Sequence, residues 1–404
     1  MNKKFNDILA CVPLDGDFRI DWDRLGDTAL SPVFSKMEKT EQDPRHHAEG
    51  NVLNHTKAVC EALVSCDEYR VLDDSDKKLT FVSALLHDIG KIRCTRVEDG
   101  AIVSPHHCSV GAVMAREFLW RQLGLCGDRD AQSFRESVCS LIRYHSFPPH
   151  ANDDNRGERY YHRMASVGEL ATGFSLRKLC LLEKADILGR ISGNGDEWLE
   201  TVEFCLMQAE EYGCADSPFV FPSDFTKRAY FKKKTDWKEQ EMYDDTWGEV
   251  ILMSGLPGTG KDTWISENCG DLPMISLDDI RNRLGILPTD NQGEVISAAK
   301  AQAREYLRKK QPFVWNATNI TDQMRGTQIQ LFEDYGASVR TVYLETEWNE
   351  QMRRNSERKA YVPQAVIEGM LSKTVLPEPH ECAKVEWYIV KKKRGSRYVY
   401  GKNT

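Results

Sequence analysis

A glycine-rich segment, residues 255–263, has residue types and spacing that could hold phosphate: it reads Gly-Leu-Pro-Gly-Thr-Gly-Lys-Asp-Thr and follows the apolar run Val250–Met253. In such a turn between a strand and a helix, backbone N–H groups face phosphate oxygens and the helix N-terminus adds a positive dipole end. Lys261 supplies a charge for the β- and γ-phosphates, which the alternative, an ordinary glycine turn, does not require. We predict a site for ATP or another nucleoside triphosphate with Mg2+, built from Gly255, Gly258, Thr259, Gly260, Lys261, Asp262 and Thr263.

Asp262 departs from the usual pattern of such loops, because it stands where Ser or Thr normally offers a hydroxyl to Mg2+. The carboxylate can reach the ion directly or through a water molecule. Thr263 is then the candidate for a phosphate contact, and the sequence leaves these arrangements open.

Asp278 and Arg281 follow the short apolar segment Met274–Ser276. Transfer of a phosphoryl group to a hydroxyl needs a carboxylate that accepts the hydroxyl proton beside the γ-phosphate, at the carboxyl end of a strand. Asp278 fits that place, and Arg281, three residues later, shares its helical face and could hold an acceptor phosphate. The alternative is a helix-start acid followed by a surface base.

Histidines and aspartates recur through the first half of the chain, where each taken alone is more often a hydrogen-bonded core residue than a ligand. Together they favour a metal site; the set is His55, His87, Asp88, His106, His107, His145 and Asp186. Lys91 lies one turn after His87 and could neutralise a phosphoryl group, although a helix C-terminal cation is the alternative. His47 is a candidate substrate contact, with a surface residue as the alternative.

The chain of 404 residues exceeds what one core usually holds, so we expect two domains. Apolar spacings of three and four predict helices from about Asn51 to Gln208, with strand signals nearly absent. After Gly248 strand-like runs alternate with helical segments, which is typical of a parallel sheet. The prediction is an all-α domain over 1–216, a linker over 217–246 and an α/β domain with a parallel sheet over 247–404.

The net charge of −8 falls mainly on the first domain and argues against a nonspecific nucleic-acid binder. The twelve cysteines form no Cys-x-x-Cys pair, and we interpret them as reduced thiols packed as small apolar groups. The sequence carries no apolar run long enough for a membrane span and no secretory leader, so it predicts a cytoplasmic protein without a membrane partner.

The His-Asp set over about residues 45–190 resembles the HD-domain metal phosphohydrolases, an all-helical family. The resemblance implies His55, His87, Asp88 and Asp186 as core ligands and His107 and His145 as ligands of a second ion, with His106 a bystander. Imidazoles and carboxylates suit two divalent transition-metal ions such as Mn2+, Fe2+, Co2+, Ni2+, Cu2+ or Zn2+, and Asp88 can bridge them. Such a pair activates water for attack on a phosphate ester.

The phosphate loop followed by Asp278-x-x-Arg281 resembles the 5′-hydroxyl polynucleotide kinases, in which the aspartate is the general base and the arginine grips the acceptor phosphate. Residues 312–319 look like the third strand and its polar turn, with Asn316 where relatives commonly have Asp. Residues 353–363 look like an arginine lid, in which Arg354 and Arg358 would close on the ATP phosphates. A solvated helix face is the alternative for these arginines.

Nearly the whole chain resembles the bacterial bifunctional end-healing enzymes called HD-Pnk, apart from the first forty residues and the linker. The resemblance implies phosphorylation of 5′-hydroxyl RNA or DNA ends and hydrolysis of 2′-phosphate and 2′,3′-cyclic phosphate ends, with a ligase acting downstream. Two other interpretations stay open. One is a nucleoside or nucleotide salvage kinase fused to an HD nucleotidase, and the other is a non-catalytic ATP-dependent switch whose HD fold binds a nucleotide.

Overall fold

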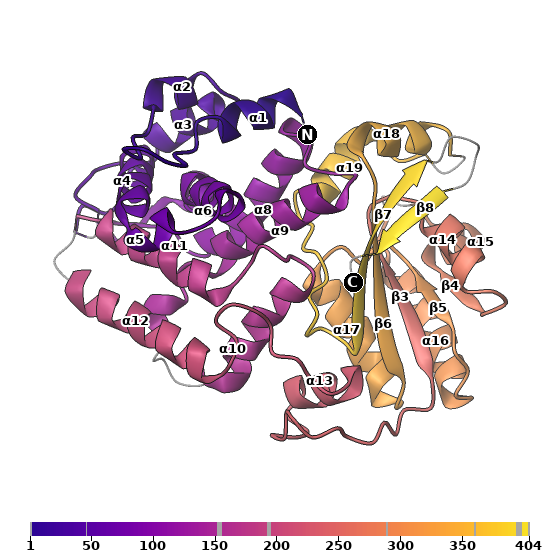
Figure 1. Cartoon of the computed structure of the whole chain (residues 1–404). Helices are drawn as coiled ribbons and strands as arrows, with labels where there is room; N and C mark the ends of the chain where they lie inside the picture. Colours follow the sequence, from indigo (N-terminus) through magenta and orange to yellow (C-terminus); the bar gives the residue numbers. More distant parts are fainter. Residues whose placement is uncertain are drawn as a thin grey trace. The chain divides into compact units, whose positions relative to one another are not determined.

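The computed structural model describes residues 2–45, 47–151, 156–191, 195–287, 290–358, 361–392 and 398–402. The chain divides into two compact units (Figure 1). The first comprises Met1–Cys126 and Asp130–Phe219, and the second comprises Gly127–Arg129 and Val220–Thr404. No described helix combines the length and the apolar character that a membrane crossing requires.

The first unit is helical. Its helices are α1 (Lys3–Leu9), α2 (Trp22–Gly26), α3 (Ser31–Glu38), α4 (Val52–Ser65), α5 (Asp67–Arg70), α6 (Asp74–Leu86), α7 (Lys91–Cys94), α8 (His107–Glu117), α9 (Arg129–Tyr144), α10 (Glu158–Ala165), α11 (Leu176–Leu188) and α12 (Gly195–Glu211). Short π and 3-10 turns occupy Phe118–Gln122, Pro148–His150 and Ser166–Glu169. Helix α6 contacts α4 and α11 and is buried continuously from Leu79 to Leu86, so it lies in the core of the unit.

Side chains at the helix starts fix where the central helices begin. Asn51, Asp73 and Ser175 each accept a hydrogen bond from the backbone N–H three residues later, at the first turns of α4, α6 and α11. Such caps satisfy N–H groups that have no partner inside the helix. The register of these three helices therefore follows from local sequence, and with it the direction of the polar residues they carry.

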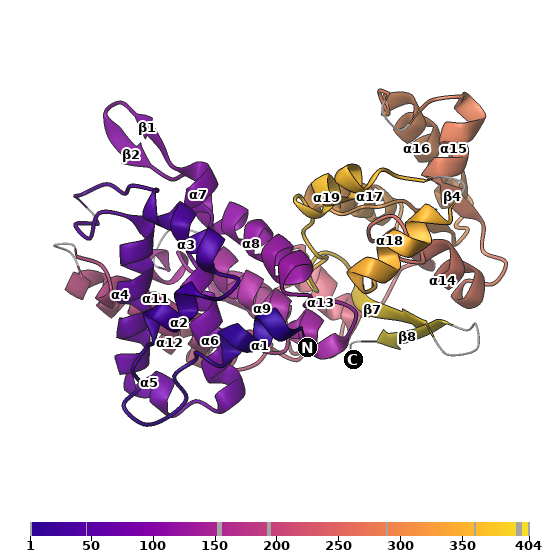
Figure 2. The ribbon, with the colours of Figure 1, turned by 90° about the horizontal axis from the view of Figure 1, so that it is seen from above.

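A hairpin interrupts the helical unit, where the sequence analysis expected almost no strand. Strands β1 (Arg96–Glu98) and β2 (Ala101–Val103) pair antiparallel, with Glu98 opposite Ala101, and project from the helices (Figure 2). Asp99 and Gly100 between them have φ of 50° and 78°. Asp-Gly is a dipeptide favoured in two-residue hairpin turns with positive φ, so the signal was present in the sequence.

The second unit is a sheet covered by helices. Its strands are β3 (Glu249–Ser254), β4 (Met274–Ser276), β5 (Val314–Asn316), β6 (Ser338–Glu345), β7 (Lys384–Lys392) and β8 (Tyr398–Lys402). Its helices are α13 (Asp224–Phe231), α14 (Lys261–Asn268), α15 (Leu277–Leu284), α16 (Gly293–Arg308), α17 (Asp322–Asp334), α18 (Trp348–Ser356) and α19 (Gln364–Leu371). The strand order is β4-β5-β3-β6-β7-β8, in which all neighbours pair in parallel except β7 and β8.

The apolar run of β3 is explained by burial on both faces of the sheet. Val250 and Leu252 pack in a cluster with residues of α16 and α17, whereas Ile251 and Met253 pack with Trp264 of α14 on the opposite face. Parallel sheets covered on both sides require such continuous apolar strands. The prediction of a helical domain followed by an α/β domain with a parallel sheet is confirmed, and β7 and β8 are additions to it.

Segment 217–246, expected to be a linker, contains helix α13. Helix α13 belongs to the second unit, where Arg228 donates to both carboxylate oxygens of Glu333 at 2.6 and 2.9 Å and to the carbonyl of His380 at 2.9 Å. Buried Ala229 and Tyr230 add apolar contact. The segment has no sustained apolar periodicity because α13 is the one helix among these described residues and has only eight residues, with irregular chain on both sides.

Candidate active sites

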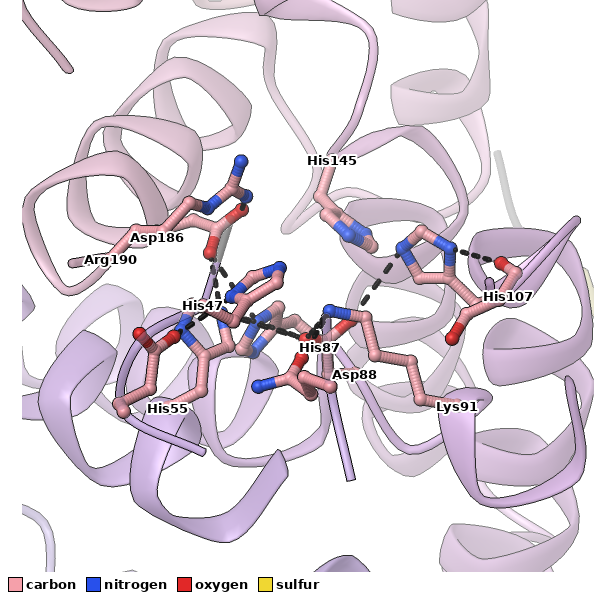
Figure 3. A network of polar contacts seen from close by, with 12 residues as sticks. His47, His55, His87, Asp88, Lys91, His107, His145, Asp186 and Arg190 are labelled. Carbon is pink, nitrogen blue, oxygen red and sulfur yellow. Dashed lines mark hydrogen bonds and ion pairs between the residues drawn. The ribbon is translucent and has the colours of Figure 1, made fainter. Parts of the chain in front are cut away.

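Six polar residues from five places in the helical unit converge on one centre (Figure 3). His55 comes from α4, His87 and Asp88 from the turn after α6, His107 from the first residue of α8, His145 from the end of α9 and Asp186 from α11. All except His107 are buried. The structure thus brings together every residue named above as a metal ligand, and leaves His106 exposed at the surface.

Asp88 lies between two sets of these side chains. Its Oδ2 is 3.4 Å from His87 Nε2 and 3.6 Å from His55 Nε2, and Asp186 Oδ1 is 2.7 Å from His55 Nε2. Its Oδ1 faces the other way and is 3.5 Å from Nε2 of His107. The two oxygens of one carboxylate therefore face different groups of donors.

The ring nitrogens of the first set have different partners. Nδ1 of His87 is 2.8 Å from the carbonyl oxygen of Ala84, which places the ring proton of His87 on Nδ1. A carboxylate oxygen lies 2.7 Å from each nitrogen of His55, Glu49 Oε1 at Nδ1 and Asp186 Oδ1 at Nε2. Burial lowers the pKa of His55, but the two carboxylates outweigh it and raise that pKa above its ordinary value. The Nε2 lone pair of His87 faces Nε2 of His55 at 3.4 Å, where a proton on His55 or a cation between the rings satisfies it.

Buried carboxylate atoms without hydrogen-bond partners support the same fit to metal ions. Within the described part of the chain, neither oxygen of Asp88 nor Oδ1 of Asp186 accepts an aligned hydrogen bond, although all are shielded from solvent. Burial opposes ionisation of Asp88, but the Lys91 ammonium and the neighbouring imidazoles outweigh it and hold the pKa of this carboxyl well below its usual range. The Asp88 carboxylate is thus buried and ionised among imidazoles, with Lys91 as an ion-pair partner and no aligned hydrogen bond, and this setting suits a divalent cation.

Gly90 lets the turn with His87 and Asp88 approach α8 closely. A Cβ at this position would lie 2.0 Å from the carbonyl oxygen of His107 and 2.6 Å from the backbone nitrogen of Gly111. No side chain fits there. Only glycine therefore allows this turn to rest on the first turn of α8 and to bring Asp88 within reach of His107.

Lys91 and Arg190 add positive charge around the carboxylates. Lys91 Nζ is 2.7 Å from Asp88 Oδ2 and donates to Gln42 at 2.7 Å, so it points into the site and not toward the end of a helix. Arg190 pairs with Asp186 at 2.5 Å, and its guanidinium lies 5.0 Å from the ring centroid of Trp198. Both cations can bind a phosphate group that approaches the carboxylates.

A pocket of about 350 Å³ opens beside these residues in the first unit. It is lined by Gln42, Asp43, His47, Asp88, Lys91, Ile102, Ser104, His107, His145, Ser146, Pro149, His150, Glu183, Asp186, Arg190 and Trp198. Ile102 belongs to β2, so the hairpin forms part of one wall. His47 lines the pocket, as a substrate contact must.

Sequence reasoning missed Glu49, Glu183 and Arg190, which the fold places in or beside this site. Oε1 of Glu49 lies 2.8 Å from His47 Nδ1 and 2.7 Å from His55 Nδ1. Burial raises the pKa of the Glu49 carboxyl, but these two rings outweigh burial and hold that pKa well below its usual range. Burial and the charge of Asp186 raise the pKa of Glu183 well above its usual value. Glu183 lies on α11, three residues before Asp186, so helical periodicity could have indicated it. Arg190 follows the end of α11, four residues after Asp186.

The second candidate site is the glycine loop between β3 and α14. Gly255, Gly258 and Gly260 have φ of 139°, 82° and 99°, and a Cβ on Gly255 would lie 2.6 Å from the carbonyl oxygen of Leu344. Thr259 closes the turn by donating its hydroxyl to the carbonyl of Leu256 at 2.9 Å. The loop therefore has the backbone that a phosphate cradle needs.

Lys261 begins α14 and folds back over this loop. Its Nζ donates to the carbonyl of Gly255 at 2.8 Å and to that of Leu256 at 3.1 Å. Burial lowers the pKa of Lys261 to about 8, since the ammonium loses water and gains only carbonyl partners. The lysine is thus held where an anionic group in the loop would stabilise its charge.

Asp262 is paired with the polar residue at the end of β5. Asn316 Nδ2 donates to Asp262 Oδ1 at 2.7 Å. Asp262 stands where such loops usually have Ser or Thr, and Asn316 stands where related kinases commonly have Asp. The hydrogen bond therefore joins the two residues that depart from the usual types. Thr263 follows in the first turn of α14. The pair holds one carboxylate and one amide oxygen beside the loop, a donor set that suits Mg2+.

Asp278, in the first turn of α15 directly after β4, forms an ion pair with Arg281 one turn later. Arg281 also donates to Gln292 Oε1 at 2.7 Å, and Arg358 Nη2 is 3.9 Å from Asp278 Oδ2. Asp278 remains 59% exposed, so solvent and an acceptor can reach it. The charge of Asp278 raises the pKa of Lys261 and the charge of Arg358 lowers it, although burial has the largest effect.

Helix α18 carries arginines beside the same loop. Gln351 donates to the carbonyl of Pro257 at 2.9 Å, and Arg354 Nη1 lies 3.4 Å from the position of a Cβ on Gly260. Arg354 is held by Glu350 at 2.8 Å. Two polar contacts between Asn355 and Val362 close the segment after the helix. Of the segment expected to form an arginine lid, Arg354 therefore lies at the glycine loop and Arg358 near Asp278, while residues 359–360 lie outside the described residues.

Comparisons with known proteins agree with this division of the chain. Residues 52–187 match the family described as HD domain, and residues 250–377 match the one described as AAA domain. The L-seryl-tRNA(Sec) kinase of Methanococcus maripaludis is 24% identical over 135 residues, which are 32% of this chain and 53% of that protein. The chain spans about half the length of this curated relative. It thus joins a helical domain that matches the HD model to a P-loop domain that matches the AAA model.

Proposed function

We propose that this chain is a bifunctional end-healing enzyme that phosphorylates 5′-hydroxyl ends of RNA or DNA with ATP and hydrolyses 2′-phosphate and 2′,3′-cyclic phosphate ends. The observation that carries the proposal is the presence of two different residue clusters in separate units. One is a glycine loop with a lysine and a nearby carboxylate, which supports addition of a phosphoryl group. The other is a set of six converging histidines and aspartates, which supports metal-assisted removal of one.

In the kinase site, the backbone N–H groups of residues 258–260 and Lys261 would bind the ATP phosphates, and Arg354 would neutralise charge on them. Asp278 would accept the proton of the attacking hydroxyl, and ADP would leave with its charge held by Lys261. Asp262 and Asn316 would hold Mg2+.

Arg281 supports an acceptor that carries a phosphate next to its hydroxyl, because its guanidinium lies beside the proposed base. The M. maripaludis relative is named as a kinase of seryl-tRNA, so its substrate contains an RNA. This supports a nucleic-acid substrate over a free nucleoside.

In the HD site, His55, His87 and Asp186 would hold one divalent ion and His107 and His145 a second, with Asp88 shared between them. Such ions supply an activated water and charge neutralisation at a phosphate ester. Lys91 and Arg190 would bind the phosphate oxygens, and Glu49 would hold the ring of His55 in the ligating tautomer. Trp198 offers a flat face for a base next to the scissile phosphate.

The decisive experiment compares acceptors and pairs of neighbouring variants. We expect phosphate transfer from ATP to a 5′-hydroxyl oligonucleotide and much weaker transfer to a free nucleoside. Asp278→Asn should lower this transfer by at least about a hundredfold, the usual worth of a general base, whereas the matched control Asp279→Asn should stay near wild type. Both variants should keep hydrolysis of 2′-phosphate ends.

Different outcomes favour the other interpretations. Equal transfer to the nucleoside and the oligonucleotide would support a salvage kinase. ATP binding without transfer to either, together with no release of phosphate from any nucleotide end under Mn2+, Co2+ or Ni2+, would support a non-catalytic switch. A ligase could use the ends produced by both proposed reactions, so sealing of a treated RNA by an added ligase is a further readout.

A further inference from the structure

Cys108 does not behave as the packed apolar thiol that the sequence suggested. Ten of the twelve cysteines are buried, whereas Cys94 and Cys108 are half-buried. Cys108 follows His107 at the start of α8, and its Sγ is 3.4 Å from His107 Nε2 and 3.8 Å from His145 Nε2. The sulfur therefore lies in the second set of donors, next to the ion position that Asp88 Oδ1 faces.

Both imidazoles present lone pairs to this sulfur. Nδ1 of His107 is 3.0 Å from the carbonyl oxygen of Ser104, and Nδ1 of His145 is 2.7 Å from that of Ile142, so each ring carries its proton on Nδ1. One S–H can donate to a single acceptor, and Ser146 Oγ at 3.3 Å competes for it. The thiol therefore leaves at least one Nε2 lone pair without a donor. His145 is only 3% exposed, so solvent has little access to its ring.

The separations match those between ligands of one tetrahedral ion. Metal–nitrogen bonds of about 2.05 Å and metal–sulfur bonds of about 2.3 Å at tetrahedral angles put N and S about 3.6 Å apart, and N and O about 3.4 Å apart. The two observed N–S distances, 3.4 and 3.8 Å, lie on either side of the first value. The 3.5 Å between His107 Nε2 and Asp88 Oδ1 is close to the second.

We propose that the thiolate of Cys108 is a ligand at the second ion position, together with His107, His145 and Asp88. The inference rests on the proposed two-ion phosphohydrolase site. On binding, the S–H proton passes to water and a metal–sulfur bond forms. A thiolate with two imidazoles selects Zn2+, Co2+ or Cu+ over Mg2+ and Mn2+, so this position and the first one differ in metal preference.

Cobalt spectroscopy tests the bond without relying on activity. The metal-free full-length protein is titrated with Co2+ while absorbance is recorded, in the wild type, Cys108→Ser and the matched control Cys94→Ser. We expect a near-ultraviolet thiolate-to-cobalt band in the wild type and Cys94→Ser that is absent from Cys108→Ser. The visible bands of cobalt bound to nitrogen and oxygen at the first position should persist in all three.

Alkylation of the wild type gives a second readout that needs no variant. With iodoacetamide and peptide mass spectrometry, saturating Zn2+ should slow modification of Cys108 at least tenfold and leave that of Cys94 unchanged. Two bound Co2+ ions without a thiolate band, and no protection by Zn2+, would overturn the role of Cys108 while the two-ion site stands. A wild type that binds no Co2+ would overturn both this inference and the proposed phosphohydrolase.

Discussion

Asp88→Asn tests the shared carboxylate with the smallest possible change of shape. In the wild type, Oδ1 lies 3.5 Å from His107 Nε2 and Oδ2 lies 3.4 Å from His87 Nε2, so one oxygen faces each set. An asparagine offers a carbonyl oxygen to one set only, and its NH2 group faces the other without a lone pair to donate. The charge that both sets share is also lost.

The negative charge of Asp88 decides how much bound metal the substitution should remove. Two divalent ions about 4 Å apart repel by about 17 kcal/mol at an effective dielectric constant of about 20. One bridging carboxylate with oxygens about 2.1 Å from the ions attracts the pair by about 23 kcal/mol on the same scale. The carboxylate of Asp88 would offset the repulsion, whereas a neutral amide would leave it in place. We therefore expect bound metal to fall from two ions to no more than one.

The assay combines metal content with two activities of the same sample. After loading with Mn2+ or Co2+ and removal of free ions, elemental analysis gives the ions per chain. Hydrolysis of a 2′-phosphate end should fall at least about 10³-fold, since loss of one ion removes several kcal/mol of transition-state stabilisation. Kinase activity in Mg2+ should stay within about twofold and serves as the folding control. Two retained ions, or hydrolysis within tenfold of the wild type, would refute the shared-carboxylate reasoning.

Three further predictions concern single sites. His107→Ala should lose the second ion, whereas His106→Ala, at its exposed neighbour, should keep both in the same elemental analysis; equal loss would contradict the ligand assignment. Because burial lowers the pKa of Lys261 to about 8 and ATP phosphates favour its charged form, ATP binding should take up about 0.7 proton at pH 8.5 and almost none at pH 7. Affinity should fall as the pH rises above 8, and calorimetric enthalpies that are equal in buffers of different ionisation enthalpy would refute this. Asn316→Asp should place two carboxylates where a 2.7 Å hydrogen bond now joins Asn316 to Asp262, lowering the unfolding free energy of the metal-free protein by about 1–3 kcal/mol. Mg2+ should restore it, and adding Asp262→Ser should remove the need for Mg2+; thermal unfolding with and without the ion decides this.

Residues with distinctive chemistry could be found from the sequence because their type and local context suffice. The glycine loop is such a case, since a strand, three glycines and a lysine in one short stretch leave few other structures. The histidines and aspartates were identified as a group, because no single one is persuasive, and their roles as ligands came from the resemblance to the HD-domain family. The structure places them together, and this convergence depends on helix packing that no local pattern encodes.

Residues whose role depends on tertiary contacts could not be identified from the sequence. Glu49 matters because the chain before α4 folds back over His55, and Cys108 stands out only when the orientations of two rings are known. The missed strand β7 is different, because the aromatic and β-branched run Trp387–Val390 is typical of a buried strand. The hairpin at 96–103 likewise carried its signal at Asp99-Gly100.

The contact at Gly90 has a consequence for how this site could change. Peptide groups of the His-Asp turn and of α8 touch there directly, because a Cβ would lie 2.0 Å from the carbonyl oxygen of His107. A side chain between two elements can switch rotamer and absorb a small shift, but touching peptide planes have no such freedom. The separation of Asp88 from His107 is therefore set by main chain. Any new metal preference at this site must come from exchanging donor atoms, since the spacing itself cannot be tuned by repacking.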